Sequence, residues 1–266
     1  MKSKTKIVLT SVIAFLVLLA VIAAGINAVY TVTIVRTDFV VRSTEGMRDA
    51  ETLQSELDER FVGKSTMFLK LEDVEETVAK YRNFRIESLE KNFPRAVELT
   101  LSEREEEIVF EVESGKYAVL DAEGIFLYEK DSLANRTGGR NVLLENFAFM
   151  VAEDGTVKGE YFSEVVSVLS ILSEKLNSVR ANVLSIRFDS AGADSNKNNH
   201  SFLISMREGV AIRIYHPSRY AAEKAAVAIE KYFSLSDSER MFGRITAIDY
   251  GTADETIATS SPREDF

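Results

Sequence analysis

Residues 61–68 read FVGKSTMF. This stretch is either part of a phosphate-binding loop or a turn that ends a helix, and the two alternatives predict different folds for the chain around it. Gly63, Lys64 and Ser65 match the last three letters of a phosphate-binding loop, in which backbone amides and a lysine hold phosphates and a hydroxyl holds magnesium. That loop also needs a glycine five residues before Gly63, where this chain has Asp58. Because a carboxylate there would repel phosphate, the sequence argues against a nucleotide site.

The residues before the turn indicate a helix instead of the strand that precedes a phosphate-binding loop. Leu53, Leu57 and Phe61 recur at a spacing of four, which places them on one helical face. We therefore expect a helix from about Met47 to Arg60, ended by Gly63 in a left-handed conformation. Residues 67–71 would then carry apolar side chains into the core.

The segments on either side extend this helix into an α+β unit over residues 30–104. The β-branched stretch 31–41 predicts a strand, and residues 72–83 predict a second helix with acids in its first turn. Residues 84–92 and 95–104 predict two further strands joined near Phe93-Pro94. The expected order is strand, helix, helix, strand, strand.

A second, β-rich domain is expected over residues 105–251, because short strands follow at hairpin spacing from residue 106 onwards. Two helices interrupt it, at residues 161–178 and 217–233. The strands 183–189 and 201–207 are joined by a polar tip, AGADSNKNN, and residues 245–250 predict the last strand. Residues 252–266 are polar, and we expect a flexible C-terminal tail.

The N-terminal end of the chain contains a candidate membrane span. Ile7 to Val29 has no charged residue, and 23 helical residues reach roughly 34 Å, enough for a hydrocarbon core of about 30 Å. A secretory signal peptide is the alternative, although its apolar stretch is usually about 7 to 15 residues. Lys2, Lys4 and Lys6 predict a cytoplasmic tail at residues 1–6, with residues 30–266 outside the membrane in a single-pass, type II orientation.

Composition excludes several function classes. An apolar content of 45% argues against wholesale disorder, and a net charge of −10 argues against nucleic acid as a partner. Without cysteine the chain has neither disulfides nor a thiol nucleophile.

Residues that could carry chemistry are few. Glu103, Glu105 and Glu107 alternate and could bind calcium, but in a strand they would share one face, for which a solvated surface is the simpler interpretation. His200 and His216 lie in no hydrolase or metalloprotease motif. We therefore expect no catalytic, cofactor-binding or metal-binding residues, although a triad assembled from distant residues stays open.

Several short motifs, taken in order, resemble the FtsQ family of bacterial cell-division proteins, called DivIB in Gram-positive bacteria. FVGKSTMF resembles the turn between the helices of the family's POTRA domain, and NFPRAVELTLSER resembles its closing strand pair. YAVLDAEGIFL resembles the hairpin that opens the family's β domain. EGVAIRIY before a Lys-containing helix, followed by ITAID, is similar to the end of that domain. The family's Arg-Tyr pair after this last motif is replaced here by Tyr250-Gly251.

The resemblance covers nearly the whole chain and implies a non-catalytic scaffold of the division machinery at the septum, linked to septal peptidoglycan synthesis. Its implied partners are small coiled-coil division proteins of the FtsB (DivIC) and FtsL type, and no small-molecule substrate is expected. We expect a partner strand to add to the last strand of the sheet, with Tyr250 as the aromatic anchor. The expected contact residues are Thr246, Ala247, Ile248, Asp249, Tyr250, Gly251 and Thr252.

Two other functions stay open from the sequence. One is a POTRA-type assembly or secretion factor of the envelope, although such proteins usually carry several POTRA units or a membrane barrel. The other is a membrane-anchored cell-wall hydrolase or sensor.

Overall fold

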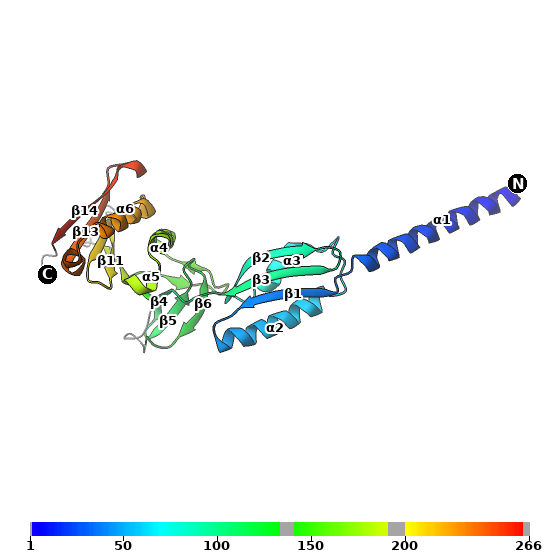
Figure 1. The fold of residues 1–266 in the computed structure, drawn as a ribbon, viewed down its shortest axis with the longest axis horizontal. Coiled ribbons are helices and arrows are strands. Elements are labelled where there is room, and N and C mark those ends of the chain that lie inside the picture. The colour runs from blue at the N-terminus through cyan, green and yellow to red at the C-terminus, as the bar shows by residue number, and fades with distance from the viewer. Residues whose placement is uncertain (1, 134–140, 191–199, 263–266) are drawn as a thin grey trace. The chain divides into compact units, whose positions relative to one another are not determined.

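The computed structural model describes residues 2–133, 141–190 and 200–262. The fold is α+β, as the sequence predicts, and the chain divides between Arg104 and Glu105 into two compact units. The N-terminal unit holds a long helix and a three-stranded sheet, and the C-terminal unit holds a nine-stranded sheet (Figure 1). The expected tip AGADSNKNN, residues 191–199, lies outside the described residues.

The chain begins with a single long helix, α1 (Lys2–Val29). Its segment Val12–Val29 has a mean hydropathy of 2.8, and none of that segment is buried within the protein. Within the residues that the structure describes, α1 is the one helix long and apolar enough to cross a membrane.

The rest of the N-terminal unit follows the order expected from the sequence. Its elements are β1 (Ile34–Val40), α2 (Thr44–Phe61), α3 (Leu71–Val78), β2 (Phe84–Asn92) and β3 (Ala96–Glu103). The strand order is β1-β3-β2, with β1 parallel and β2 antiparallel to β3. The apolar stripes of both helices close over the sheet to form one core, which includes Leu53, Leu57, Phe61, Val74, Val78, Val97, Leu99 and Leu101.

The turn after α2 confirms one expectation and corrects another. Gly63 has a φ of 89°, so it ends the helix in the left-handed region. Leu69 is buried as expected, but Phe68 is 82% exposed and Met67 is exposed as well. The amides of Phe68 and Leu69 both bond to the carbonyl of Ser65, and in so tight a turn only one of the consecutive apolar side chains faces the core.

In the C-terminal unit one sheet runs in the order β14-β13-β12-β11-β10-β7-β4-β5-β6. Its strands are β4 (Ile108–Glu113), β5 (Lys116–Leu120), β6 (Phe126–Lys130), β7 (Val142–Glu145), β10 (Val183–Ser190), β11 (His200–Met206), β12 (Ala211–Tyr215), β13 (Gly243–Asp249) and β14 (Thr256–Pro262). A separate small ribbon pairs β8 (Met150–Val151) with β9 (Val157–Lys158). The helices are α4 (Phe162–Lys175), α5 (Val179–Asn182), α6 (Ala221–Phe233) and α7 (Asp237–Phe242).

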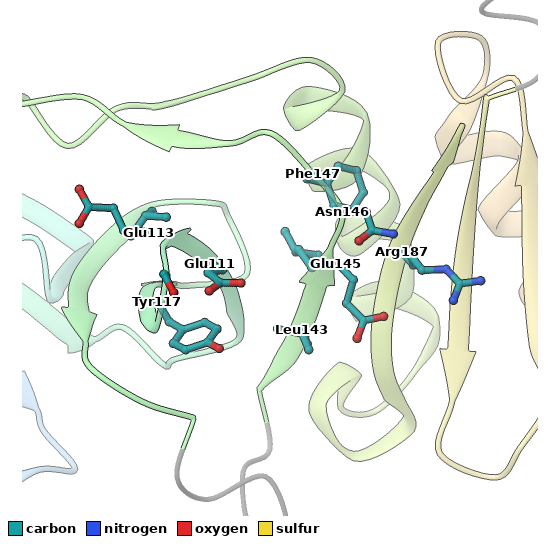
Figure 2. Close-up of a pocket in the computed structure, with 11 residues that line it drawn as sticks. Glu111, Glu113, Tyr117, Leu143, Glu145, Asn146, Phe147 and Arg187 are labelled. Carbon is teal, nitrogen blue, oxygen red and sulfur yellow. The ribbon is translucent and has the colours of Figure 1, made fainter. Parts of the chain in front are cut away.

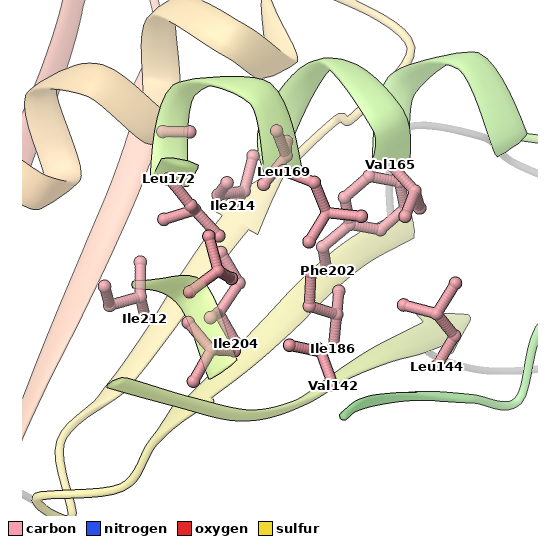
Figure 3. Close-up of a cluster of buried hydrophobic side chains, with 14 of the residues drawn as sticks. Val142, Leu144, Val165, Leu169, Leu172, Ile186, Phe202, Ile204, Ile212 and Ile214 are labelled. Carbon is pink, nitrogen blue, oxygen red and sulfur yellow. The ribbon is translucent and has the colours of Figure 1, made fainter. Parts of the chain in front are cut away.

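The core of this unit lies between one face of the sheet and the two longer helices. Val165, Leu169 and Leu172 of α4 point onto strand residues that include Ile186 and Phe202 (Figure 3). In β12 alternate residues face this core: Ile212 and Ile214 are buried and their neighbours are partly exposed. Helix α6 adds Ala225, Ala228 and Ile229.

The C-terminal end differs from the expected flexible tail at residues 252–266. Ala253–Glu255 form a short 3-10 helix, and Thr256–Pro262 form β14, which pairs antiparallel with β13 from Asp249↔Thr256 to Gly243↔Pro262. The β-branched residues and the packing of Ala258 against the core favour this strand, and its polar composition suits a position at the border of the sheet. Residues 263–266 lie outside the described residues.

Candidate partner-binding edge

The residues expected to contact a partner lie on β13 and in the turn after it. Residues 246–249 belong to β13, and residues 250–252 lead into the short 3-10 helix. Strand β13 pairs with β12 on one side and with β14 on the other. A partner strand therefore has no place beside β13, and the border of the sheet that could accept one is β14.

The accessibility of these residues differs from one to the next. Tyr250 is 67% exposed, Gly251 and Thr252 are exposed, and Ile248 and Thr246 are partly exposed. Ala247 is fully buried in the core. The structure thus leaves Tyr250 available as an anchor, while Ala247 belongs to the interior.

Strand β14 has the properties of an accepting edge. Its sequence, TIATSSP, contains no charge, and most of its residues are exposed. Edge strands usually avoid pairing with other chains by carrying charges or bulges, or by being short. At seven residues β14 is as long as β13, and Pro262 at its end is its single protective residue.

An ionic network around the buried carboxylate of Asp249 holds the turn between β13 and β14. The side chain of Asp249, 2% exposed, lies 2.9 Å from the ammonium of Lys224 and 3.1 Å from the guanidinium of Arg219. Its Oδ1 also accepts a hydrogen bond from the amide of Gly251, at 3.2 Å. The carbonyl of Gly251 in turn accepts bonds from Arg219 and from the hydroxyl of Tyr220, each at 3.2 Å.

Lys224 is fully buried, and its ammonium is satisfied from several sides. It donates to the carbonyls of Tyr215 and His216, at 2.7 and 2.9 Å. Burial lowers the pKa of Lys224, because it disfavours the charged form, and the carboxylate of Asp249 opposes that effect. Burial acts to raise the pKa of Asp249, but the bond from Lys224 and the nearby charges outweigh it, so the pKa of Asp249 is lowered.

Together these contacts join the start of α6 to the turn that carries Tyr250. Sequence reasoning missed Lys224, although its position gives a signal: it lies in the stripe Ala221, Ala225, Ala228 that faces the core. A lysine in an apolar stripe requires a buried partner. The sequence could not identify that partner, because Asp249 lies 25 positions further along the chain.

The alternating glutamates do not form the shared solvated face that the sequence suggested. Glu103 accepts bonds from the amides of Arg42 and Ser43, at 2.6 and 2.9 Å, just before α2 begins. Glu105 and Glu107 instead pair with Arg180, at 2.7 and 3.3 Å. The three carboxylates serve two structural contacts, because strand β3 ends at Glu103 and the alternation ends with it.

No group of three or more metal-ligating side chains occurs within residues 2–133, 141–190 and 200–262. The histidines have structural neighbours: His200 Nδ1 lies 2.6 Å from the hydroxyl of Tyr161, and the carbonyl of His216 accepts from Lys224. The imidazole of His216 meets the ring of Tyr215 edge to face, with centroids 6.3 Å apart.

One polar pocket of about 690 Å³ lies where β7 ends between β4 and β10. Its lining includes Glu111, Glu113, Glu145, Tyr117 and Arg187. Figure 2 shows the carboxyl groups of Glu113 and Glu145 pointing away from one another.

Comparison with protein-family models and with curated proteins finds no match to this chain.

Proposed function

We propose that this chain is a non-catalytic, single-pass membrane scaffold of bacterial cell division, of the FtsQ (DivIB) type. In this proposal α1 anchors the protein, and the two units outside the membrane recruit small coiled-coil division proteins of the FtsB and FtsL type. The scaffold would link these partners to septal peptidoglycan synthesis. The N-terminal unit would correspond to a POTRA domain and the C-terminal unit to the family's β domain.

The element order supports this proposal. The resemblance implies an apolar helix, then strand, helix, helix, strand, strand, then a β-rich body, and the described elements follow that order. FVGKSTMF forms the turn between α2 and α3, where the resemblance places it.

The observation that carries the proposal is the uncharged edge strand β14 beside an exposed Tyr250. An extended segment of a partner can continue the sheet there through main-chain hydrogen bonds, and an aromatic side chain at its start can supply a hot spot. Strand addition needs no pocket and no reactive group. We therefore place the contact on β14 and Tyr250, next to the residues expected from the sequence.

Photocrosslinking in native membranes tests this function. A photoreactive residue replaces Tyr250 in one variant of the full chain and Tyr128 in another. Tyr128 is a matched control because it is also an exposed tyrosine, on β6, the strand at the opposite end of the same sheet. Captured proteins are then identified by mass spectrometry.

We expect the Tyr250 variant to capture small single-span coiled-coil division proteins and the Tyr128 variant to capture none of them. Capture of those proteins at Tyr128 alone would overturn the assignment of the edge. Capture at neither position, with the protein spread evenly around the cell instead of at the septum, would overturn the division function.

A further inference from the structure

The N-terminal unit presents a set of exposed side chains on two loops, which bond to the end of α1 or to the residues just after it and are joined by a bond from the hydroxyl of Thr66 to the carbonyl of Pro94, at 2.7 Å. We call it the span-proximal surface; its members are Val62, Lys64, Met67, Phe68, Lys70, Phe93 and Arg95. The first five come from the turn between α2 and α3, and the last two come from the turn between β2 and β3.

Hydrogen bonds tie the first of these turns to the residues that follow α1. The amide of Thr66 donates to the carbonyl of Tyr30, and the amide of Val32 donates to the carbonyl of Lys64, at 2.6 and 2.7 Å. The hydroxyl of Thr66 reaches the carbonyl of Tyr30 as well, at 2.8 Å. Since α1 ends at Val29, this turn lies within a few residues of the end of the span.

The second turn is tied to the helix itself. The guanidinium of Arg95 donates to the carbonyls of Val29 and Ala28, at 3.1 and 3.2 Å. The rings of Phe93 and Tyr30 meet edge to face, with centroids 6.3 Å apart. Both turns are therefore held at the level where α1 leaves the hydrocarbon core, if α1 crosses a membrane.

The apolar members of this surface are unusually exposed for their size. Phe68 is 82% exposed, Phe93 is 56% exposed, and Met67 and Val62 are also exposed. A group of large apolar side chains in water indicates a surface that another phase or molecule covers. Aromatic side chains at the two borders of a bilayer are the common case next to a span.

Charge is segregated on the same two turns. Residues 61–70 and 91–96 contain Lys64, Lys70, Lys91 and Arg95 and no acid, in a chain whose net charge is −10. Cations next to an exposed apolar group suit a membrane surface with anionic lipids, because the charges meet phosphates while the apolar side chains enter the interface.

We propose that the span-proximal surface rests in the interface of the same membrane that α1 crosses. Phe68 and Phe93 lie among the lipid headgroups and the first acyl carbons, and Lys64 and Lys70 contact the phosphates of anionic lipids. The N-terminal unit then contacts the membrane through these side chains as well as through α1. This inference depends on the membrane anchoring in the proposed function, but not on division or on any protein partner.

The chain has no tryptophan, so a single introduced tryptophan reports on its own surroundings. The full chain is reconstituted in phosphatidylcholine vesicles that contain phosphatidylglycerol, with or without lipids brominated on the acyl chains. Three variants are compared: Phe68→Trp at the proposed contact, Leu18→Trp within α1, and Phe242→Trp, an exposed phenylalanine in the C-terminal unit.

We expect brominated lipid to quench roughly half or more of the Trp fluorescence in F68W and L18W and to leave F242W unquenched. Quenching in L18W without quenching in F68W would overturn the membrane contact and leave the anchor intact. An unquenched L18W would overturn the anchor itself, and with it the proposed scaffold.

A charge variant tests the lipid phosphates separately. Lys64→Glu with Lys70→Glu, made in the F68W background, should lose part of the quenching in vesicles with phosphatidylglycerol and not in pure phosphatidylcholine. Equal quenching with and without the two lysines would overturn their role in binding phosphate.

Discussion

The nine-stranded sheet ends in two strands, β6 and β14, that border the sheet in different ways. Strand β6 has five residues, FLYEK, and carries the charged pair Glu129 and Lys130. Strand β14 has seven, TIATSSP, and carries none. Charge and shortness protect an edge from pairing with other chains, so β6 is a protected edge and β14 is an open one.

The turns that lead to these two strands also differ in how they are held. Before β6, Asp121 accepts the amides of Glu123 and Ile125, at 3.0 and 2.8 Å. Before β14, Asp249 accepts the amide of Gly251 and in addition pairs with the buried Lys224. An aspartate shapes each turn, but at the open edge a buried cation from α6 also anchors it. In the proposed function, a fixed position of β14 and Tyr250 would lower the entropy lost on binding a partner strand.

The largest expected effect comes from Lys224→Met, which leaves Asp249 buried beside the open edge without its closest cation. Removing one partner of a buried ion pair typically costs about 3–5 kcal/mol. The free energy of unfolding, measured by urea titration of the full chain, should fall by that order. Lys130→Met on β6 is the matched control, and it should stay within about 0.5 kcal/mol of the wild type. A small effect in both variants would contradict the anchoring role of Lys224.

The next largest effect is a pH dependence of the free energy of unfolding, which we expect from Asp249 in the turn before β14. The lowered pKa of Asp249 contributes stability that is present above its unfolded value, about 3.9, and is lost as the pH falls through the folded pKa. Asp249→Asn should therefore unfold more easily than wild type at pH 7, by about 1–3 kcal/mol. The two curves should converge below about pH 4. Unfolding free energies at several pH values check this, and a constant difference down to acid pH would argue against it.

A smaller effect follows when the protection of β6 is transferred to β14. Thr259→Glu with Ser260→Lys places the charged pair of β6 on two exposed neighbours of the open edge. Capture of the partner should weaken at least tenfold, which is about 1.4 kcal/mol. The free energy of unfolding should change by less than about 0.5 kcal/mol. Undiminished capture would mean that the partner does not pair with β14.

The smallest effect on the free energy of unfolding is expected when β6 receives the uncharged residues of β14. Glu129→Thr with Lys130→Ser removes the charges of β6, and the free energy of unfolding should stay within about 0.5 kcal/mol of the wild type. Sedimentation should then show self-association that rises with protein concentration, because a second edge has become open. A monomer at all concentrations would show that shortness alone protects β6.

The part of the fold that local sequence determines could be predicted. The spacing of Leu53, Leu57 and Phe61 specifies the face of α2, and Gly63 specifies its end, since both depend on neighbours within a few residues. Strand β14 could not be predicted, because TIATSSP has no regular alternation of apolar and polar residues. Its pairing with β13 decides its conformation, and tertiary context of this kind overrides local preference.

The sequence predicts the region of the candidate site but not the strand that forms its edge. The sequence predicts Tyr250 as an aromatic anchor, and the structure shows that it is exposed, but the open edge lies one strand further on than Thr246 and Ile248 suggest. The burial of Asp249 is likewise a long-range property, because Lys224 reaches it from another element. Contacts between residues so far apart in the chain cannot be identified from one sequence and become visible only in the folded structure.

Amide hydrogen exchange on the full chain, with and without the partner captured at Tyr250, tests the central claim most directly. If a partner strand adds to the open edge, the amides of β14 should gain protection when the partner binds, while those of β6 should exchange as before. Protection gained on β6, or binding that leaves β14 unprotected, would contradict strand addition at this edge.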